Sequence, residues 1–317
     1  MPLFCVFDLG SVSGDNLLPI SITNTKYSCS TRPQPQPHWE RIADTMTTHD
    51  WSIAGKTVLL TGATDGIGLA LARELHERGA RLLLHGRDEA KGRRLLADLD
   101  GDHAWYPADL VSLARVEALT ETVMKNEPRL EVLICNAGVY RTELEYSTEG
   151  FELTWAVNHL AHFLLVNRLV YLLARSEPSR VIVTASMAHR FTDGIPLEQT
   201  VHPTSYDAGE AYARSKGSNI AFTLELARRL EGSGIACGCL HPGVISTKLL
   251  HAGFGPGGEP PRRGALRTLR PAADLDAAEL HGRYFENDRP TEPAAYTRDP
   301  ELQRGLWELS ERLTGLA

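Results

Sequence analysis

The chain has 317 residues, a formal net charge of −7, 42% hydrophobic residues and 23% charged residues. This composition is typical of a globular protein with a large core, and the excess of acidic residues argues against a nucleic-acid partner. The five cysteines follow no disulfide spacing, so we expect reduced thiols and a cytoplasmic protein.

Residues 1–50 form the first segment and differ in composition from the rest. Ser, Thr, Asn and Pro are dense there, and no helical or strand period is present. Residues 1–10 lack the basic region of a signal peptide. We therefore expect a disordered leader that is dispensable as far as residue 45, with Met46 as an alternative start of translation. Docking of Trp39 and Ile42 on the domain stays open as an alternative.

Beyond the leader, short apolar runs alternate with amphipathic segments. This pattern predicts a parallel sheet covered by helices on both faces, and so one α/β domain over residues 51–317. Strands are expected over residues 57–61, 81–85, 103–107, 131–135, 180–185, 235–240 and 283–286. Helices are expected over residues 66–79, 88–98, 112–126, 148–174, 209–232 and 300–313.

Two segments of this domain have an unusual composition. Residues 153–173 form the longest apolar stretch, but Asn158, His162 and Arg168 lie inside it, and a bilayer tolerates such side chains badly. We expect a buried helix there and no membrane span. Residues 244–278 are rich in Gly and Pro and are expected to form a mobile substrate loop with short helices.

A glycine-rich turn links the first strand to the first helix. Glycines let backbone N–H groups approach a pyrophosphate at a helix N-terminus, where the helix dipole favours negative charge. The spacing G-x-x-x-G-x-G departs from the G-x-G-x-x-G dinucleotide fingerprint, but the strand–turn–helix context is the same. The predicted cofactor contacts of this turn are Gly62, Thr64, Asp65, Gly66, Ile67 and Gly68.

The end of the second strand bears on the choice of cofactor. An NAD site usually has an acidic residue there that binds the ribose hydroxyls, whereas this chain has Gly86 followed by Arg87. A guanidinium can bind a 2′-phosphate, so NADP(H) is expected to be preferred, with NAD(H) possible. The alternative is a solvated surface Arg87, with Asp88 serving only as the cap of the next helix.

Small and polar residues follow the third and fourth strands as well. In open α/β sheets the carboxyl ends of the strands form the edge that binds ligands. Small side chains there would let an adenosine lie against the backbone. The expected contacts at this edge are Asp109, Leu110, Asn136, Ala137 and Gly138.

Tyr212 and Lys216 open the helix that follows the fifth strand. Their spacing of four places both on one helix face. A nearby ammonium and a positive nicotinamide would favour the phenolate form of Tyr212, which makes this residue a candidate proton donor and acceptor. Ser186 at the end of the fifth strand could bond to the substrate oxygen, and Asn158 could hold a water next to Lys216.

In their order along the chain, these motifs resemble the short-chain dehydrogenase/reductase family. T-G-x-x-x-G-x-G, N-A-G, Tyr-x-x-x-Lys and the L-H-P-G-V-I-S-T run at residues 240–247 all match, from about residue 55 onward. Residues 157–163, 188–189 and 283–285 are similar to the branch of the retinol dehydrogenases and WW-domain oxidoreductases. The resemblance implies a seven-stranded Rossmann sheet of order 3-2-1-4-5-6-7, doubly wound.

The resemblance also assigns roles to residues. It implies a catalytic tetrad of Asn158, Ser186, Tyr212 and Lys216, with Tyr212 and Lys216 contacting the cofactor as well. Lys216 would grip the nicotinamide ribose. A second set of residues, in the segment after the sixth strand, would hold the nicotinamide: Pro242, Gly243, Val244 and Thr247.

Together these features predict an NADP(H)-dependent oxidoreductase that interconverts an alcohol and an aldehyde or ketone by hydride transfer. The partner is a small and apolar substrate, and a homo-oligomer is compatible with the family. A cofactor-binding regulator without turnover and a reductase of carbon–carbon double bonds stay open as alternatives. No metal site is expected. His159 and His162 have no third ligand nearby in the sequence and are interpreted as structural residues, and Cys237 and Cys239 as small buried residues of a strand.

Overall fold

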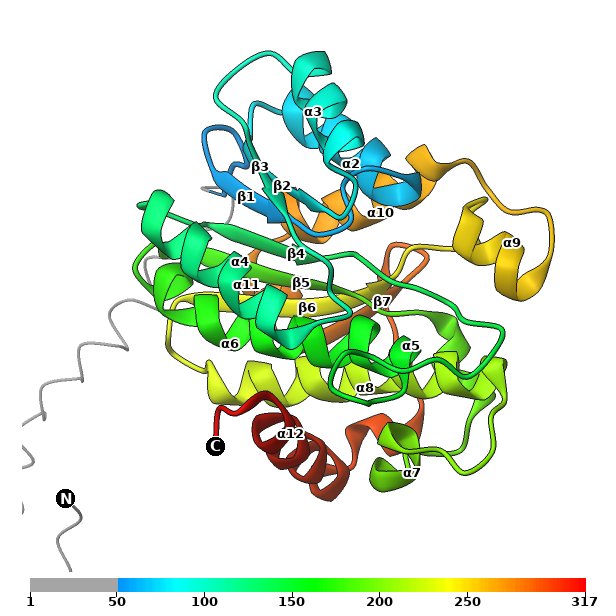
Figure 1. Ribbon diagram of the computed structural model, residues 1–317. Helices are drawn as coiled ribbons and strands as arrows, with labels where there is room; N and C mark the ends of the chain where they lie inside the picture. The colour runs from blue at the N-terminus through cyan, green and yellow to red at the C-terminus, as the bar shows by residue number, and fades with distance from the viewer. Residues whose placement is uncertain (1–50) are drawn as a thin grey trace, which may run out of the picture. The chain divides into compact units, whose positions relative to one another are not determined.

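Eight strands form one sheet in the computed structural model, which describes residues 51–317 (Figure 1). The order is β3-β2-β1-β4-β5-β6-β7-β8, and all neighbours from β3 to β7 are parallel. The expectations for residues 1–50 lie outside the described part of the chain. The strands are β1 (Thr57–Leu60), β2 (Arg81–Gly86), β3 (Ala104–Pro107), β4 (Val132–Cys135), β5 (Ser179–Thr184), β6 (Ile235–His241), β7 (Arg283–Glu286) and β8 (Arg289–Pro290).

The expected order of the first seven strands is confirmed, but the sheet has an eighth strand that we did not expect. β8 pairs antiparallel with β7 through a tight turn at Asn287 and Asp288. Their φ angles are 52° and 63°, and such left-handed pairs form the two-residue hairpin turns that match the strand twist. Pro290 has no N–H to offer a further strand, so β8 is a short and protected sheet edge.

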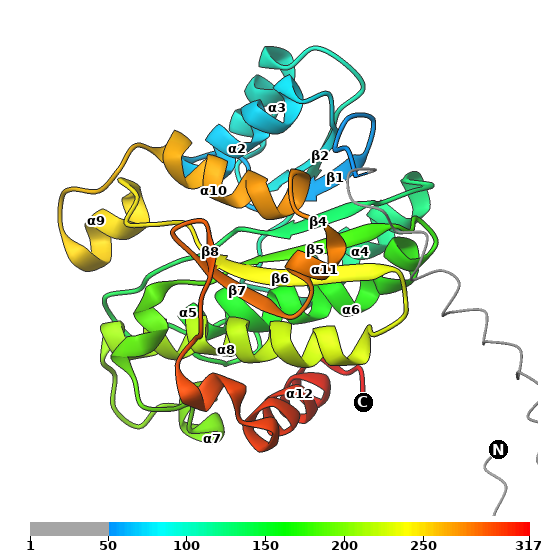
Figure 2. The ribbon, with the colours of Figure 1, turned by 180° about the vertical axis from the view of Figure 1, so that it is seen from behind.

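Helices cover both faces of the sheet, as expected (Figures 1 and 2). One face carries α2 (Gly66–Glu77), α3 (Glu89–Asp98) and α10 (Pro261–Ala273), and the other carries α4 (Leu113–Asn126), α6 (Ala161–Ala174) and α8 (Ala208–Arg229). α12 (Pro300–Thr314) packs on the outer side of α8. The shorter helices are α5 (Leu153–Trp155), α7 (Leu197–Val201), α9 (Lys248–Phe254), α11 (Ala277–Leu280) and the turns η1 (Ala156–Leu160), η2 (Met187–Phe191) and η3 (Ala295–Arg298).

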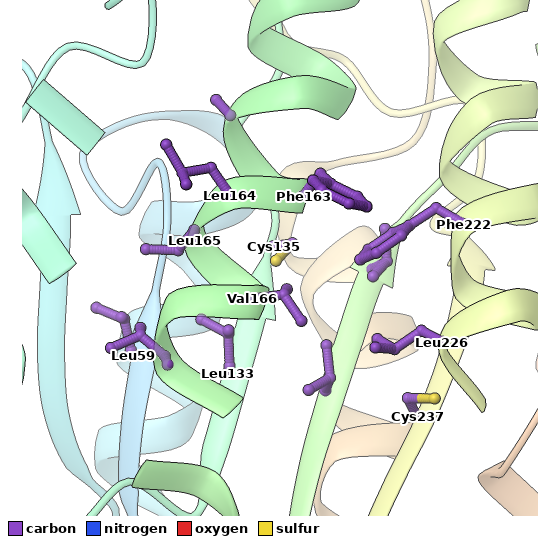
Figure 3. Packing of buried hydrophobic residues seen from close by; sticks show 14 of the residues in the cluster. Leu59, Leu133, Cys135, Phe163, Leu164, Leu165, Val166, Phe222, Leu226 and Cys237 are labelled. Atoms are coloured by element: carbon purple, nitrogen blue, oxygen red, sulfur yellow. The ribbon is translucent and has the colours of Figure 1, made fainter. Parts of the chain in front are cut away.

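Aromatic side chains join α6, α8 and α12 above the sheet. Phe163 of α6 points toward Phe222 of α8, with ring centroids 5.4 Å apart, and Leu133 of β4 lies in the same cluster (Figure 3). Trp307 of α12 packs edge-on against Phe163 at 4.9 Å. Burial of such large side chains contributes most of the folding free energy, so this core fixes the helices that carry the site residues.

The segment expected as one helix over residues 148–174 is divided. It begins at Leu153, and residues 156–160 form a π-helical turn in which the Ala161 N–H bonds to the Ala156 carbonyl. π-turns inside α-helices frequently mark functional sites. The stretch Leu153–Ala174 is long and apolar enough to cross a membrane, yet 78% of its most apolar window is buried inside the protein. The expected buried helix is confirmed.

The segment 244–278 also differs from the expected loop with short helices. Residues 261–273 form α10, a helix of 13 residues that packs against α2. Ala265, Leu269 and Ala272 are buried at a helical spacing of four and three. Of the prolines that suggested a loop, Pro260 is the N-cap of this helix and Pro261 is its first residue, a position where Pro is favoured.

Candidate active site

A cavity of about 650 Å³ opens at the carboxyl edge of the sheet. β1 and β4 are neighbours at its centre, where the strand order reverses, and open α/β sheets bind ligands at such switch points. Its lining contains every residue predicted to contact a cofactor: Gly62, Thr64, Asp65, Gly66, Ile67, Gly68, Arg87, Asp109, Leu110, Asn136, Ala137, Gly138, Tyr212, Lys216, Pro242, Gly243, Val244 and Thr247.

The two ends of the glycine-rich turn approach each other too closely for any side chain at Gly68. A Cβ at Gly68 would lie 2.0 Å from the Gly62 carbonyl oxygen, and Gly62 itself has a φ of +70°. The turn therefore brings bare backbone to the N-terminus of α2. Asp65 caps this helix, because its Oδ1 accepts the Gly66 N–H at 2.8 Å.

Two buried residues that the sequence analysis missed hold this turn in place. The Thr61 hydroxyl accepts the N–H groups of Asn136 and Ala137, both at 2.9 Å, and so joins the turn to the segment after β4. His85 lies under the turn, with Nδ1 accepting the Gly62 N–H at 3.4 Å. Burial lowers the pKa of His85 to about 4, so this imidazole is neutral and can accept.

The end of β2 is crowded by an aromatic ring. A Cβ at Gly86 would lie 2.7 Å from Cη2 of Trp105, so this position cannot carry a side chain without movement of the indole. Arg87 is exposed, lines the cavity, and forms no ion pair within residues 51–317. Asp88 caps α3 through the Lys91 N–H at 3.0 Å.

α8 carries Tyr212 and Lys216 into the cavity. The helix starts at Asp207, whose side chain accepts the Glu210 N–H at 2.7 Å. Both Tyr212 and Lys216 are buried, and Lys216 Nζ lies 5.7 Å from the centre of the Tyr212 ring and donates to the Thr184 carbonyl at 2.9 Å. The structure thus brings the two residues to one wall, as their spacing predicted.

Burial sets the protonation of this pair. It raises the pKa of Tyr212, and a hydrogen bond with the Ser186 side chain acts in the opposite direction. Burial also lowers the pKa of Lys216 to about 8. The sequence argument favoured a phenolate, whereas in the cofactor-free protein desolvation outweighs the hydrogen bond with Ser186 and favours the neutral phenol of Tyr212.

Asn158 is the one predicted tetrad residue that does not line the cavity. It is fully buried in η1, and its Nδ2 donates to the Val139 carbonyl and to the Ser215 hydroxyl, both at 3.0 Å. Both donors of its amide are therefore used, and the expected water next to Lys216 finds no free N–H on this side chain. Asn158 joins the segment after β4 to α8.

The other end of the cavity is apolar. Its lining there includes Val139, Met187, Phe191, Leu250 and Phe254. Tyr140, outside the lining, packs against both Tyr212 and Phe254, with ring centroids 5.5 Å apart in each pair. These residues were missed by the sequence analysis, since no motif marks them.

The histidines and cysteines that we set aside are buried and contact other residues of the protein. His159 contacts the Ser310 hydroxyl at 3.0 Å, and His162 bonds to the Asn158 carbonyl and to Thr61. Cys237 and Cys239 are buried free thiols. The described part of the chain contains no group of three or more His, Cys, Asp or Glu side chains placed to hold a metal ion.

Comparison with known proteins gives consistent results. The sequence profile of the short chain dehydrogenase family matches residues 56–254. Retinol dehydrogenase 14 from Mus musculus is 37% identical over 294 residues, which cover 83% of this chain and 86% of the relative.

Solved structures share the fold. A crystal structure of an uncharacterized protein from Mycobacterium paratuberculosis superposes with a TM-score of 0.70 at 32% identity and covers 84% of this chain and 96% of that one. The active-site complex of Pseudomonas aeruginosa RhlG with NADP has a TM-score of 0.60 at 25% identity and covers 78% of this chain and 99% of that one.

Proposed function

Because the chain belongs to the short-chain dehydrogenase/reductase family, in the branch of the retinol dehydrogenases, we propose that it interconverts an apolar alcohol and its aldehyde or ketone with NADP(H), using Tyr212 as the acid and base. Family membership makes the protein an oxidoreductase that acts on CH–OH groups. The observation that carries the finer proposal is the position of Tyr212 and Lys216 in the same cavity as the glycine turn.

The residues of the cavity fit a dinucleotide. The bare backbone around Gly62 and Gly68 would take the pyrophosphate at the N-terminus of α2. Arg87 would bind a 2′-phosphate, since it is exposed and has no acidic partner within residues 51–317. Crowding by Trp105 keeps any carboxylate away from position 86, which removes the group that favours NAD. The RhlG relative, with 25% identity, was solved with NADP.

The bound cofactor would supply the hydride that adds to the carbonyl carbon. Tyr212, as the neutral phenol, would donate a proton to the carbonyl oxygen, so that hydride and proton together convert C=O to CH–OH. Ser186 would hydrogen bond to the same oxygen and orient it. Lys216 would return a proton to Tyr212, and Asn158 would act by positioning the backbone of Val139 and the hydroxyl of Ser215. Oxidation of the alcohol runs through the same groups in reverse.

The apolar end of the cavity supports an apolar substrate. Met187, Phe191 and Phe254 offer no hydrogen-bonding groups, so a polar chain on the substrate would lose its bonds to water. The retinol dehydrogenases are named for an apolar alcohol, which agrees with this lining.

The purified full chain tests the function directly. NADPH and NADH consumption is followed with a panel of apolar aldehydes, ketones, quinones and enones, and the products are identified. Alcohol formation with NADPH supports the proposal. Saturation of the carbon–carbon bond of an enone with its carbonyl left intact assigns the protein to double-bond reductases instead. Tight cofactor binding with no turnover on any substrate assigns it to regulators.

We also propose a cytoplasmic location. Cys135, Cys237 and Cys239 are free and buried, as in proteins of reducing compartments. Imaging of the full chain with a fluorescent tag tests this, and a signal confined to an organelle contradicts it.

A further inference from the structure

α9 (Lys248–Phe254) projects away from the sheet in the segment that follows β6 (Figure 1). None of its residues is buried, while Lys248, Leu249, Leu250 and Phe254 line the cavity. The three glycines that follow, Gly255, Gly257 and Gly258, have φ angles of +85°, +132° and +95°, a backbone that gains no stiffness from side chains. Such a helix can move as a unit about its flanking segments.

Contacts at both ends attach α9 to the rest of the domain. At its C-terminal end, Phe254 packs against the rings of Tyr140 and Tyr212 at 5.5 and 6.0 Å. At its N-terminal end, Lys248 Nζ lies 2.6 Å from Oδ2 of Asp65 in the glycine turn, 183 residues away in the sequence. The side chain of the preceding Thr247 also lies against this turn, 3.1 Å from the Cβ that Gly66 would carry.

The ion pair spans the part of the cavity where the cofactor phosphates are expected. Asp65 and Lys248 both line the cavity, Asp65 from the glycine turn and Lys248 from the first residue of α9. Their side chains are 54% and 80% exposed, so the pair is weak and screened by salt. A contact this weak can break and re-form at little cost in free energy.

We propose that Asp65 and Lys248 form a latch that closes α9 over the dinucleotide cleft and controls the exchange of the cofactor. The claim about cofactor exchange rests on the proposed function, whereas the claim that the ion pair holds α9 does not. The latch opens when the pair separates, α9 swings on the glycine-rich segment after it, and the cofactor passes. Loss of the pair should therefore speed both association and dissociation of the cofactor and leave the equilibrium between them nearly unchanged.

A direct bond from Lys248 to a cofactor phosphate is the competing explanation, and it makes opposite predictions. Removal of the ammonium would then weaken cofactor binding. Removal of the Asp65 charge would strengthen binding, because Lys248 would be released to the phosphate. The signs of the two single changes therefore separate a latch from a ligand.

The experiment uses Lys248→Met, Asp65→Asn and the double variant of the full chain. Met keeps the length of the stem, and Asn remains a good helix cap for α2. Arg78→Met is the control, because Arg78 forms an equally long-range ion pair with Asp274 at 2.8 Å, and neither residue lines the cavity.

The first measurement is hydrogen–deuterium exchange of residues 248–254 in the cofactor-free protein. An exposed pair of this kind should slow opening by about two- to fivefold, so each single variant should exchange faster by that factor. The double variant should exchange no faster than the singles, since both changes break the same contact. Unchanged exchange in α9, or additive effects in the double variant, would overturn the latch.

The second measurement is stopped-flow binding and displacement of NADPH. Both rate constants should rise by similar factors in the two single variants and stay unchanged in Arg78→Met. A higher Kd in Lys248→Met with a lower Kd in Asp65→Asn would overturn the latch in favour of a direct phosphate contact. If NADPH binds neither the natural chain nor any variant, the proposed function fails. Hydrogen–deuterium exchange then decides by itself whether the pair holds α9.

Discussion

The side chain of Asn158 pairs with the backbone of Val139 through two hydrogen bonds. Oδ1 accepts the Val139 N–H at 2.7 Å, and Nδ2 donates to the Val139 carbonyl at 3.0 Å. The π-turn η1 carries this amide to the segment after β4, where the position that a Cβ of Gly138 would take lies 3.3 Å from Asn158 Oδ1 and 3.6 Å from Lys216 Nζ. A residue outside the cavity thereby fixes the backbone that forms its wall.

Asn158→Ala should lower both stability and activity. The change removes the partner of the Val139 N–H and carbonyl, which are only partly buried, so the cost should lie at or below about 1–3 kcal/mol for each group. Denaturant unfolding measures the loss, and turnover should fall more than the cofactor Kd changes. Asn167→Ala is the matched control, because the Asn167 amide donates to the Phe163 carbonyl at 2.8 Å on a helix flank away from the cavity. Equal turnover losses in both variants would contradict a positioning role.

The parts of the site that the sequence predicted are those whose chemistry is local. The glycine turn lies within a few residues of β1 and α2, and Lys216 follows Tyr212 by four positions on one helix face. Backbone geometry alone then brings them together. The Asn287–Asp288 turn that creates β8 was not predicted, but the sequence does contain a signal for it, since both residue types tolerate a positive φ.

Other parts depend on partners far along the chain. Lys248 meets Asp65 and Asn158 meets Val139 only after the fold has formed, and no spacing in the sequence marks either pair. A helix as long as 261–273 was not predicted, because the Gly and Pro residues of 244–278 indicated a loop with short helices, and the spacing of Ala265, Leu269 and Ala272 was not considered. Tertiary packing against α2 decided that segment, as it often overrides local signals.

Tyr212→Phe should abolish most of the turnover. The change removes one oxygen and keeps the buried ring, so the proton donor is lost while the packing against Tyr140 stays. Turnover should fall by at least ~10² with little change in NADPH affinity. Tyr284→Phe is the control, as it removes the oxygen of a buried phenol outside the cavity. Near-natural kcat in Tyr212→Phe on a confirmed substrate would mean that another group moves the proton.

Arg87→Met should shift the cofactor preference. The guanidinium is exposed at the end of β2, where it can form charge-assisted bonds to a 2′-phosphate that NADH lacks. Affinity for NADPH should fall by about tenfold or more, and affinity for NADH should stay unchanged. Titration of both cofactors into the variant and the natural chain measures the two affinities. Arg94→Met on the outer face of α3 serves as the control, because Arg94 does not line the cavity. Tighter NADH than NADPH binding in the natural chain would refute the assignment.

Gly86→Asp should fail to convert the site to NAD. The new Cβ would lie 2.7 Å from the Trp105 ring, so overpacking costs about 1–3 kcal/mol before the carboxylate meets any ribose. Thermal unfolding should show the loss. Gly86→Asp together with Trp105→Leu should recover stability relative to the single variant and raise the ratio of NADH to NADPH affinity. A stable single variant with good NADH binding would show that the indole moves freely.

The alkaline side of the pH profile should report Lys216. Burial lowers the pKa of this ammonium to about 8, so below that pH the side chain is charged and above it the charge is lost progressively. kcat/KM for NADPH reports groups of the free enzyme, and it should be level below about pH 8 and fall as the pH rises through that value. Burial keeps Tyr212 protonated over the same range, since its pKa is raised, and the buried histidines of the site are already neutral. Lys216→Met should therefore give low activity with no break near pH 8. A break that persists in this variant would assign the titration to a different group.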